Sequence, residues 1–168
     1  MSLFASIQTG CLIAFALLLL LAAWQDWRTM LIADGIPLGI IAIFAAWATA
    51  GFLSGTFFLS DLALALVCAA GMFGLGTLAF AVGAMGGGDV KLAAVVSLFA
   101  GPALILDFVV VTAVVGGLLA VAILAGAPAG PVASAGDGTV RARLRGNLPY
   151  GPAIAVGGLW VALTLALT

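Results

Sequence analysis

Long apolar runs separated by short polar breaks constrain this chain more than any other feature of its sequence. The runs at 3–24, 36–53 and 62–84 each have the length that a helix needs to cross the hydrocarbon layer of a membrane, about 20 residues for about 30 Å. Hydrophobic residues make up 65% of the chain and charged residues 7%, whereas a soluble domain is about half apolar. Helices of this length satisfy their own backbone polar groups in lipid, so the sequence predicts an all-α integral membrane protein.

The polar composition excludes several classes of function. The chain contains no histidine, and all of its acidic residues are aspartates, which excludes histidine-based triads and most zinc enzymes. Its two cysteines, Cys11 and Cys68, lie inside apolar runs without CxxC spacing, so they indicate neither a zinc site nor a redox motif. A net charge of −1 provides no electrostatic basis for binding nucleic acid. We therefore expect no metal, no cofactor and no nucleic-acid partner.

The first apolar run shares one feature with a secretory signal peptide, the small residues Ala22 and Ala23 near its end. No lysine or arginine precedes this run, however, and Arg28 follows it, whereas a signal peptide carries positive charge before its apolar region. We therefore expect a retained helix whose N-terminus lies outside the cytoplasm.

The apolar run at 90–125 is too long for one ordinary span. As a helix that rises about 1.5 Å per residue it would measure about 54 Å. Gly101-Pro102 and Asp107 interrupt the run, and they predict separate helices at 90–106 and 108–125.

Two further segments complete the predicted fold. A loop rich in glycine, proline, alanine and serine occupies 126–147, and we expect it to be mobile and cytoplasmic. The last apolar run occupies 150–167. The sequence thus predicts a bundle of six transmembrane helices that forms a single domain over 1–168.

The positions of the basic residues test this helix count, because lysine and arginine collect in the cytoplasmic loops of membrane proteins. Six helices place all five basic residues on one side of the membrane: Arg28, Lys91, Arg141, Arg143 and Arg145. Five helices would separate Lys91 from the three arginines that follow it. We therefore expect six helices, with both termini outside the cytoplasm.

Two aspartates are predicted at the cytoplasmic face, Asp26 just beyond the first helix and Asp89 just before the fourth. An ionisable residue at membrane depth is a candidate functional residue. Two carboxyl groups can hydrolyse an amide when one takes a proton from water and the other donates a proton to the substrate. Close like charges cannot both ionise easily, so such a pair titrates as a unit. The dipoles of the adjoining helices favour Asp89 as the base and Asp26 as the proton donor.

Simpler interpretations of these acids stay open. Asp89 also fits the N-cap position of a helix, and Asp26 with Arg28 also fits a solvated interfacial loop. Asp61 and Asp107 fall on the opposite side, where we expect helix caps or interface residues. A small ion-coupled transporter and a non-catalytic membrane subunit are the alternative functions, although a transporter is expected to place its acids near the midplane, often within inverted repeats that this sequence does not show.

Three motifs resemble those of the type IV prepilin peptidase family. Residues 86–92 read GGGDVKL, which is similar to the family motif GxGDxKL, and residues 148–155 read LPYGPAIA, which is similar to the PYGPAI segment that opens the last helix of the family. Asp26-Trp27-Arg28 followed by Ile32-Ala33-Asp34 resembles the family's first-aspartate loop, DxR with IPN, except that Ala33-Asp34 replaces Pro-Asn. The order and spacing of the motifs agree over nearly the whole chain.

The resemblance implies an aspartic endopeptidase with Asp26 and Asp89 as its catalytic pair. The implied substrates are pilin precursors, in which a basic leader precedes an apolar helix, and the implied site of cleavage is the cytoplasmic face of the bacterial inner membrane. Longer members of the family carry paired CxxC motifs and a methyltransferase activity. This chain has no CxxC motif, so it resembles the short, peptidase-only form associated with Flp-type, tight-adherence pili.

The same motifs suggest which residues shape the site. Glycines allow the backbone of a substrate to approach closely. Lys91 either favours the ionised form of Asp89 or extends to lipid headgroups, and Tyr150 is either a site residue or an interfacial anchor. We predict a substrate-binding or site-shaping role for the following residues: Asp34, Gly86, Gly87, Gly88, Lys91, Pro149, Tyr150, Gly151 and Pro152.

Overall fold

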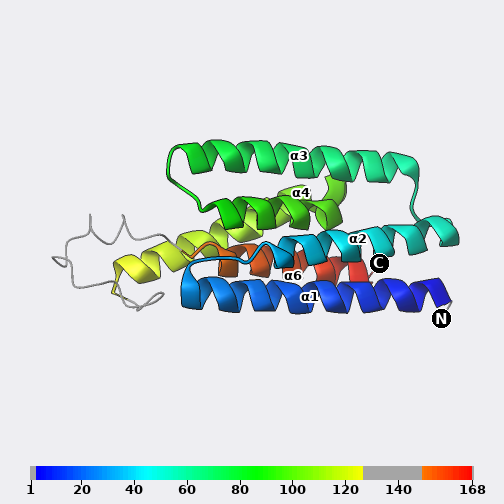
Figure 1. Cartoon of the computed structure of the whole chain (residues 1–168), viewed down its shortest axis with the longest axis horizontal. Helices are drawn as coiled ribbons and strands as arrows, with labels where there is room; N and C mark the ends of the chain where they lie inside the picture. The colour runs from blue at the N-terminus through cyan, green and yellow to red at the C-terminus, as the bar shows by residue number, and fades with distance from the viewer. Residues whose placement is uncertain (1–2, 127–148, 168) are drawn as a thin grey trace.

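The computed structural model describes residues 3–126 and 149–167, and these residues form helices joined by short connections. The helices shown in Figure 1 are α1 (Leu3–Thr29), α2 (Gly35–Ser54), α3 (Leu59–Ala81), α4 (Gly87–Leu124) and α6 (Gly151–Leu167). Among them, α1 to α4 are long and apolar enough to cross a membrane, and α6 is a shorter apolar helix. The protein is therefore an all-helical, multi-pass membrane protein, as predicted.

Helix α4 is divided by a sharp change of direction at Gly101, whose φ of 50° and ψ of −167° are not helical. Glycine tolerates a positive φ because it lacks a Cβ, and Pro102 removes the next backbone donor. Figure 1 shows the chain reversing there, so that the two segments of α4 run antiparallel. The predicted boundary between 90–106 and 108–125 is wrong, because Asp107 lies inside the second segment and the break is at Gly101.

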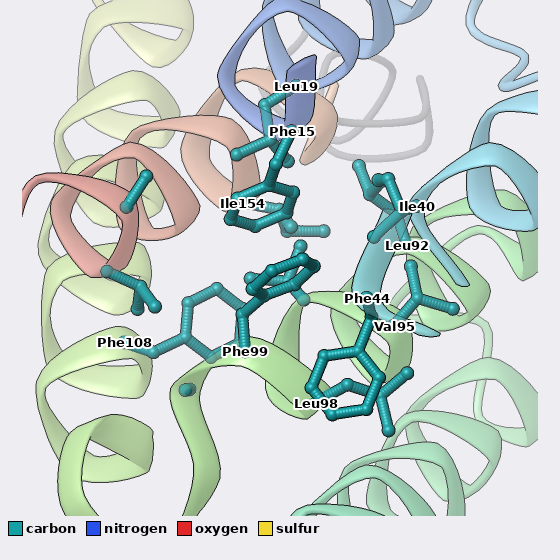
Figure 2. Packing of buried hydrophobic residues seen from close by; sticks show 14 of the residues in the cluster. Phe15, Leu19, Ile40, Phe44, Leu92, Val95, Leu98, Phe99, Phe108 and Ile154 are labelled. Atoms are coloured by element: carbon teal, nitrogen blue, oxygen red, sulfur yellow. The ribbon is translucent and has the colours of Figure 1, made fainter. Parts of the chain in front are cut away.

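The core is centred on the first segment of α4, in which residues 92–100 are all buried. The Phe99 ring stacks on Phe15 with centroids 4.2 Å apart and meets the Phe44 ring edge-on at 5.2 Å. Figure 2 shows these rings around Phe99, with Phe108 from the second segment beside them. The aromatic cluster thus joins α1, α2 and both segments of α4.

Helix α1 extends to Thr29, beyond the predicted end at 24, so Asp26 lies in its last turn. Its buried side chains follow one face at intervals of three or four residues: Leu12, Phe15, Leu19, Ala22 and Asp26. The interpretation of Asp26 as part of a solvated loop is wrong, because its side chain continues the buried stripe of the helix.

Helix α4 begins at Gly87 rather than at 90, so Asp89 lies in its first turn. The N-cap position belongs to Gly86, and Asp89 stands three residues further along. The interpretation of Asp89 as an N-cap is therefore wrong.

The remaining predictions about the fold have mixed outcomes. Asp61 caps α3 as expected, because its Oδ2 accepts a hydrogen bond of 2.8 Å from the Phe58 N–H. The helices predicted at 36–53, 62–84 and 150–167 end within a few residues of α2, α3 and α6. The loop predicted at 126–147 lies, after its first residue, outside the described residues.

Candidate active site

The end of α1 and the start of α6 meet at Asp26. Its Oδ2 accepts a hydrogen bond of 2.8 Å from the backbone N–H of Gly151, the first residue of α6. Amide groups in the first turn of a helix have no acceptor inside that helix, so the carboxyl supplies one. A Cβ at residue 151 would lie 2.6 Å from the Cβ of Asp26, and only glycine allows this approach.

Asp89 is buried to a similar degree, with 6% of the residue exposed against 4% for Asp26. Its Oδ2 is turned back towards the backbone of Gly86, where a Cβ would lie 2.9 Å from it. The other oxygen, Oδ1, is buried and has no hydrogen-bond partner within the described part of the chain. A buried polar oxygen without a partner is costly and calls for an explanation.

The structure brings the two predicted aspartates together, because their carboxyl groups are close enough for the charges to interact. In the residues that the structure describes, the one ion pair joins Lys91 to Asp34, so no cation neutralises the aspartates there. Two buried acids without a cation are unfavourable, and two nearby carboxylates cannot both ionise easily. Such a pair favours one ionised and one protonated carboxyl, which is the combination that acid–base hydrolysis requires.

The connection between α1 and α2 passes beside both aspartates. The backbone N–H of Ala33 donates to the side chain Oε1 of Gln25 at 3.2 Å. Ile32 packs against Gly88, where a Cβ would lie 3.1 Å from the Ile32 Cβ. The Asp34 carboxylate pairs with Lys91 at 2.7 Å. This connection therefore touches the residues next to Asp26 and next to Asp89.

The glycines before Asp89 have different surroundings. At Gly86 and Gly88 the space that a side chain would need is taken by Asp89 and Ile32 of the same chain, whereas a Cβ at Gly87 would make only an ordinary contact of 3.6 Å with Phe80. The close approach that we expected from a substrate backbone is made at two of these glycines by the protein itself.

The remaining predicted residues lie at the start of α6. Pro149 is fully buried, and Gly151 is the donor to Asp26. The Tyr150 ring packs on the hydrophobic core and lies 3.9 Å from the Cβ position of Gly116 in α4. Pro152 is partly buried in the first turn of α6. Of this motif, Gly151 is the residue that the structure joins directly to an aspartate.

The chain matches a known protein family over most of its length. The model of the type IV leader peptidase family matches residues 13–121, which include Asp26, Asp89 and the GGGDVKL motif. The chain belongs to the type IV leader peptidase family. Comparisons with curated proteins and with solved structures gave no match. The predicted family is thus confirmed, and the alternatives of a transporter and a non-catalytic subunit are not favoured.

In this leader peptidase, two helix ends act on the Asp26 carboxyl in opposite directions. The C-terminus of α1 disfavours the anion of Asp26. The Gly151 N–H at the start of α6 acts on the same carboxyl in the opposite direction. The assignment of Asp89 as base and Asp26 as proton donor stays a prediction.

The sequence did not predict a site role for Gln25 or Ile32, although Gln25 adjoins one aspartate and Ile32 contacts the neighbour of the other. Gln25 holds the α1–α2 connection through its side-chain amide, and Ile32 packs on Gly88. Gln25 carried a usable signal, because it is a polar residue directly beside Asp26 in a mostly apolar segment. Ile32 carried none, since one isoleucine among many gives no indication of its contact.

A groove of about 480 Å³ lies between the last turns of α1 and the start of α2 of the peptidase. Its polar wall includes Gln25, Arg28 and Thr29, and the Arg28 guanidinium lies over the Trp24 ring at 4.4 Å. Neither aspartate lines this groove. The groove is therefore separate from the carboxyl pair.

Proposed function

We propose that this leader peptidase is an aspartic endopeptidase in which Asp26 and Asp89 act together on the scissile peptide bond. The observation that carries the proposal is the convergence of two buried carboxyl groups from the ends of α1 and α4, with Asp89 Oδ1 left without a partner among the described residues. Fold stability gives no reason to bury two acids beside each other, because each loses hydration and they repel each other.

The proposed reaction is acid–base hydrolysis of an amide. One carboxylate takes a proton from water while the water oxygen bonds to the carbonyl carbon, and the second carboxyl donates its proton to the carbonyl oxygen. The tetrahedral intermediate then breaks its C–N bond, and the leaving nitrogen receives a proton from the carboxyl that took one from water. The second carboxylate takes back a proton from a hydroxyl of the intermediate as the C=O bond re-forms, so both carboxyl groups return to their starting states. The Oδ2 atoms of both carboxyl groups have backbone neighbours, at Gly86 and Gly151, so the two Oδ1 atoms are the oxygens left to act on the water and the substrate.

We propose pilin precursors of the Flp type as the substrates. The family implies prepilins, and the sequence resemblance favours the short, peptidase-only form. A precursor with an apolar helix can lie in the same bilayer as the peptidase, which raises its local concentration and fixes its orientation. Its leader would then meet the carboxyl pair at the cytoplasmic surface of the bacterial inner membrane.

We further propose six membrane-crossing segments with both termini outside the cytoplasm. The two antiparallel segments of α4 supply two of the six, and the start of α1 and the end of α6 lie at the same end of the bundle in Figure 1. Arg28 lies in the last turn of α1 and Lys91 lies near the start of α4. Both are therefore at the end of the bundle away from the start of α1, as expected if positive charge collects in the cytoplasm. A periplasm-dependent reporter fused after Thr168 should be active, and inactivity would contradict this topology.

Co-expression with candidate Flp pilin precursors tests the catalytic pair. Asp26→Asn and Asp89→Asn, made separately, should each abolish leader removal as measured by the mass of the pilin, because an amide cannot exchange the proton that hydrolysis requires. Asp107→Asn is the matched control, since it removes an exposed acid from the same helix as Asp89.

The control should process the precursor at the wild-type rate. Full processing by either active-site variant would refute the paired mechanism. A transporter would instead lose ion-dependent uptake in these variants, and a non-catalytic subunit would assemble as before with no change in processing.

A further inference from the structure

The ion pair between Lys91 and Asp34 has a position that its contribution to stability does not explain. Lys91 and Asp34 approach to 2.7 Å, yet their side chains are 50% and 72% exposed. Exposed ion pairs contribute little to the stability of a fold, because water solvates both charges in either state. This pair nevertheless links the segment that follows Asp26 to the helical turn that contains Asp89.

The segment at 30–34, which we call the strap, is attached at three points. Ala33 is held by Gln25, the neighbour of Asp26 in α1. Ile32 packs on Gly88, the neighbour of Asp89 in α4. Asp34 is held by Lys91, one helical turn into α4. Each attachment therefore falls within two residues of one of the two aspartates.

The backbone at the beginning of the strap is in a conformation that needs support. Met30 has a φ of 53°, in the left-handed region that residues with a Cβ rarely adopt. Its N–H still donates to the carbonyl of Asp26 at 2.8 Å, which ends α1 and directs the chain towards α4. Backbone strain of this kind persists where surrounding contacts hold it, and the strap attachments are such contacts.

The two helices that carry the aspartates are held together largely by intermediaries. Helix α1 packs mainly against α2 and α6, and α4 packs mainly against α3, α6 and α2. Near the carboxyl groups, Gly151 of α6 holds Asp26, and the strap joins both sides. A change in the strap is thus expected to alter the separation of the two carboxyl groups without unfolding the bundle.

We propose that Lys91 and Asp34 are positioning residues of the peptidase, which fasten the strap across the first turn of α4 and so set the position of Asp89 relative to Asp26. The proposal rests on the proposed function of the two aspartates. It assigns Lys91 a role different from the two predicted for it, since its ammonium group donates a hydrogen bond to Asp34 Oδ1.

Leader-cleavage kinetics of the full-length protein test the proposal. Lys91→Met and Asp34→Asn should each lower kcat about 10-fold with little change in KM, because a small displacement of a catalytic group slows the chemical step. The exchanged pair, Lys91→Asp with Asp34→Lys, should recover most of the wild-type kcat. Asp107→Asn is again the control for removing an exposed charge.

A second readout measures position without catalysis. In a protein with Cys11→Ala and Cys68→Ala, the substitutions Asp26→Cys and Asp89→Cys allow a short bifunctional thiol reagent to join the two sites. Lys91→Met should slow this cross-linking several-fold, and the exchanged pair should restore it. Because this variant has no catalytic aspartates, its result holds even if the proposed chemistry is wrong.

Three results would overturn the positioning role. Wild-type cleavage and cross-linking in Lys91→Met would make the contact an ordinary surface ion pair. Slower cleavage with unchanged cross-linking, or with a raised KM, would place Lys91 on the substrate. Failure of the exchanged pair to recover either rate would show that the two residues do not act through each other.

Discussion

Two groups of charged residues lie at the same end of this molecule, and their environments are opposite. Asp26 and Asp89 are almost completely buried, and no cation neutralises them in the described residues. Asp34 and Lys91 form a close ion pair that is largely exposed to solvent. The first arrangement is unfavourable for a fold, whereas the second costs little and contributes little.

Because burying the two aspartates destabilises the fold, their position requires an explanation other than stability. Natural proteins depart from favourable local arrangements mainly at functional sites. The buried acids of this leader peptidase are such a departure. The exposed ion pair is important for its position, because it joins the α1–α2 connection to the start of α4. The following predictions test this contrast, beginning with the largest effect on activity.

Asp26→Asn and Asp89→Asn should separate activity from stability. Cleavage should fall by at least about 10³-fold, because each substitution removes one partner of a general acid–base pair. The thermal unfolding midpoint in detergent should stay the same or rise, since the repulsion between two buried acids is removed. Unfolding at a clearly lower temperature would mean that the aspartates are structural.

Gly151→Ala should be the most damaging change outside the aspartates. Its Cβ would overlap Asp26, at 2.6 Å from the Asp26 Cβ, so the carboxyl must move or lose its N–H donor. Cleavage should fall about 100-fold, as expected when a catalytic group is displaced by about 1 Å. Gly117→Ala is the matched control, because a Cβ there meets nothing within 4 Å. Equal cleavage by both variants would contradict the proposed function of the Gly151 contact.

Lys91→Met should have an intermediate effect on activity and almost none on stability. The free energy of unfolding should change by less than about 1 kcal/mol, since the ion pair is exposed. Cleavage should still fall about 10-fold through the displaced strap. Denaturation and cleavage measured on the same preparation decide between this outcome and a purely structural role, which would lower both together.

Asp61→Ala should affect stability alone. The carboxylate caps α3 by accepting the Phe58 N–H, and loss of a helix cap costs about 1 kcal/mol. Asp61 begins α3, whereas the carboxyl pair lies near the following connection from α3 to α4, so cleavage should be unchanged. A large loss of cleavage in this variant would show that activity follows overall stability. The buried acids would then not differ from the exposed acids in their importance for activity.

The errors of the sequence predictions have specific physical causes. The end of α1 was placed too early because Asp26 and Arg28 read as a polar loop, whereas the first turn of α6 provides Asp26 with a buried donor. The break at 90–125 was assigned partly to Asp107 because a charge interrupts the apolar run. The structure places it at Gly101, where a positive φ turns the chain. In both cases a contact or a backbone angle outweighed the local polarity.

The sequence by itself determined the membrane character, the approximate helices, the family and the two candidate aspartates. These are properties of contiguous residues, namely the length of apolar runs and short motifs such as GGGDVKL. Only the tertiary structure decided which face of each helix is buried, because a helix that is apolar on every side shows no amphipathic contrast. It also decided the partners of the polar groups, Gly151 for Asp26 and Asp34 for Lys91, since these residues are far apart in the chain and meet only when the helices pack.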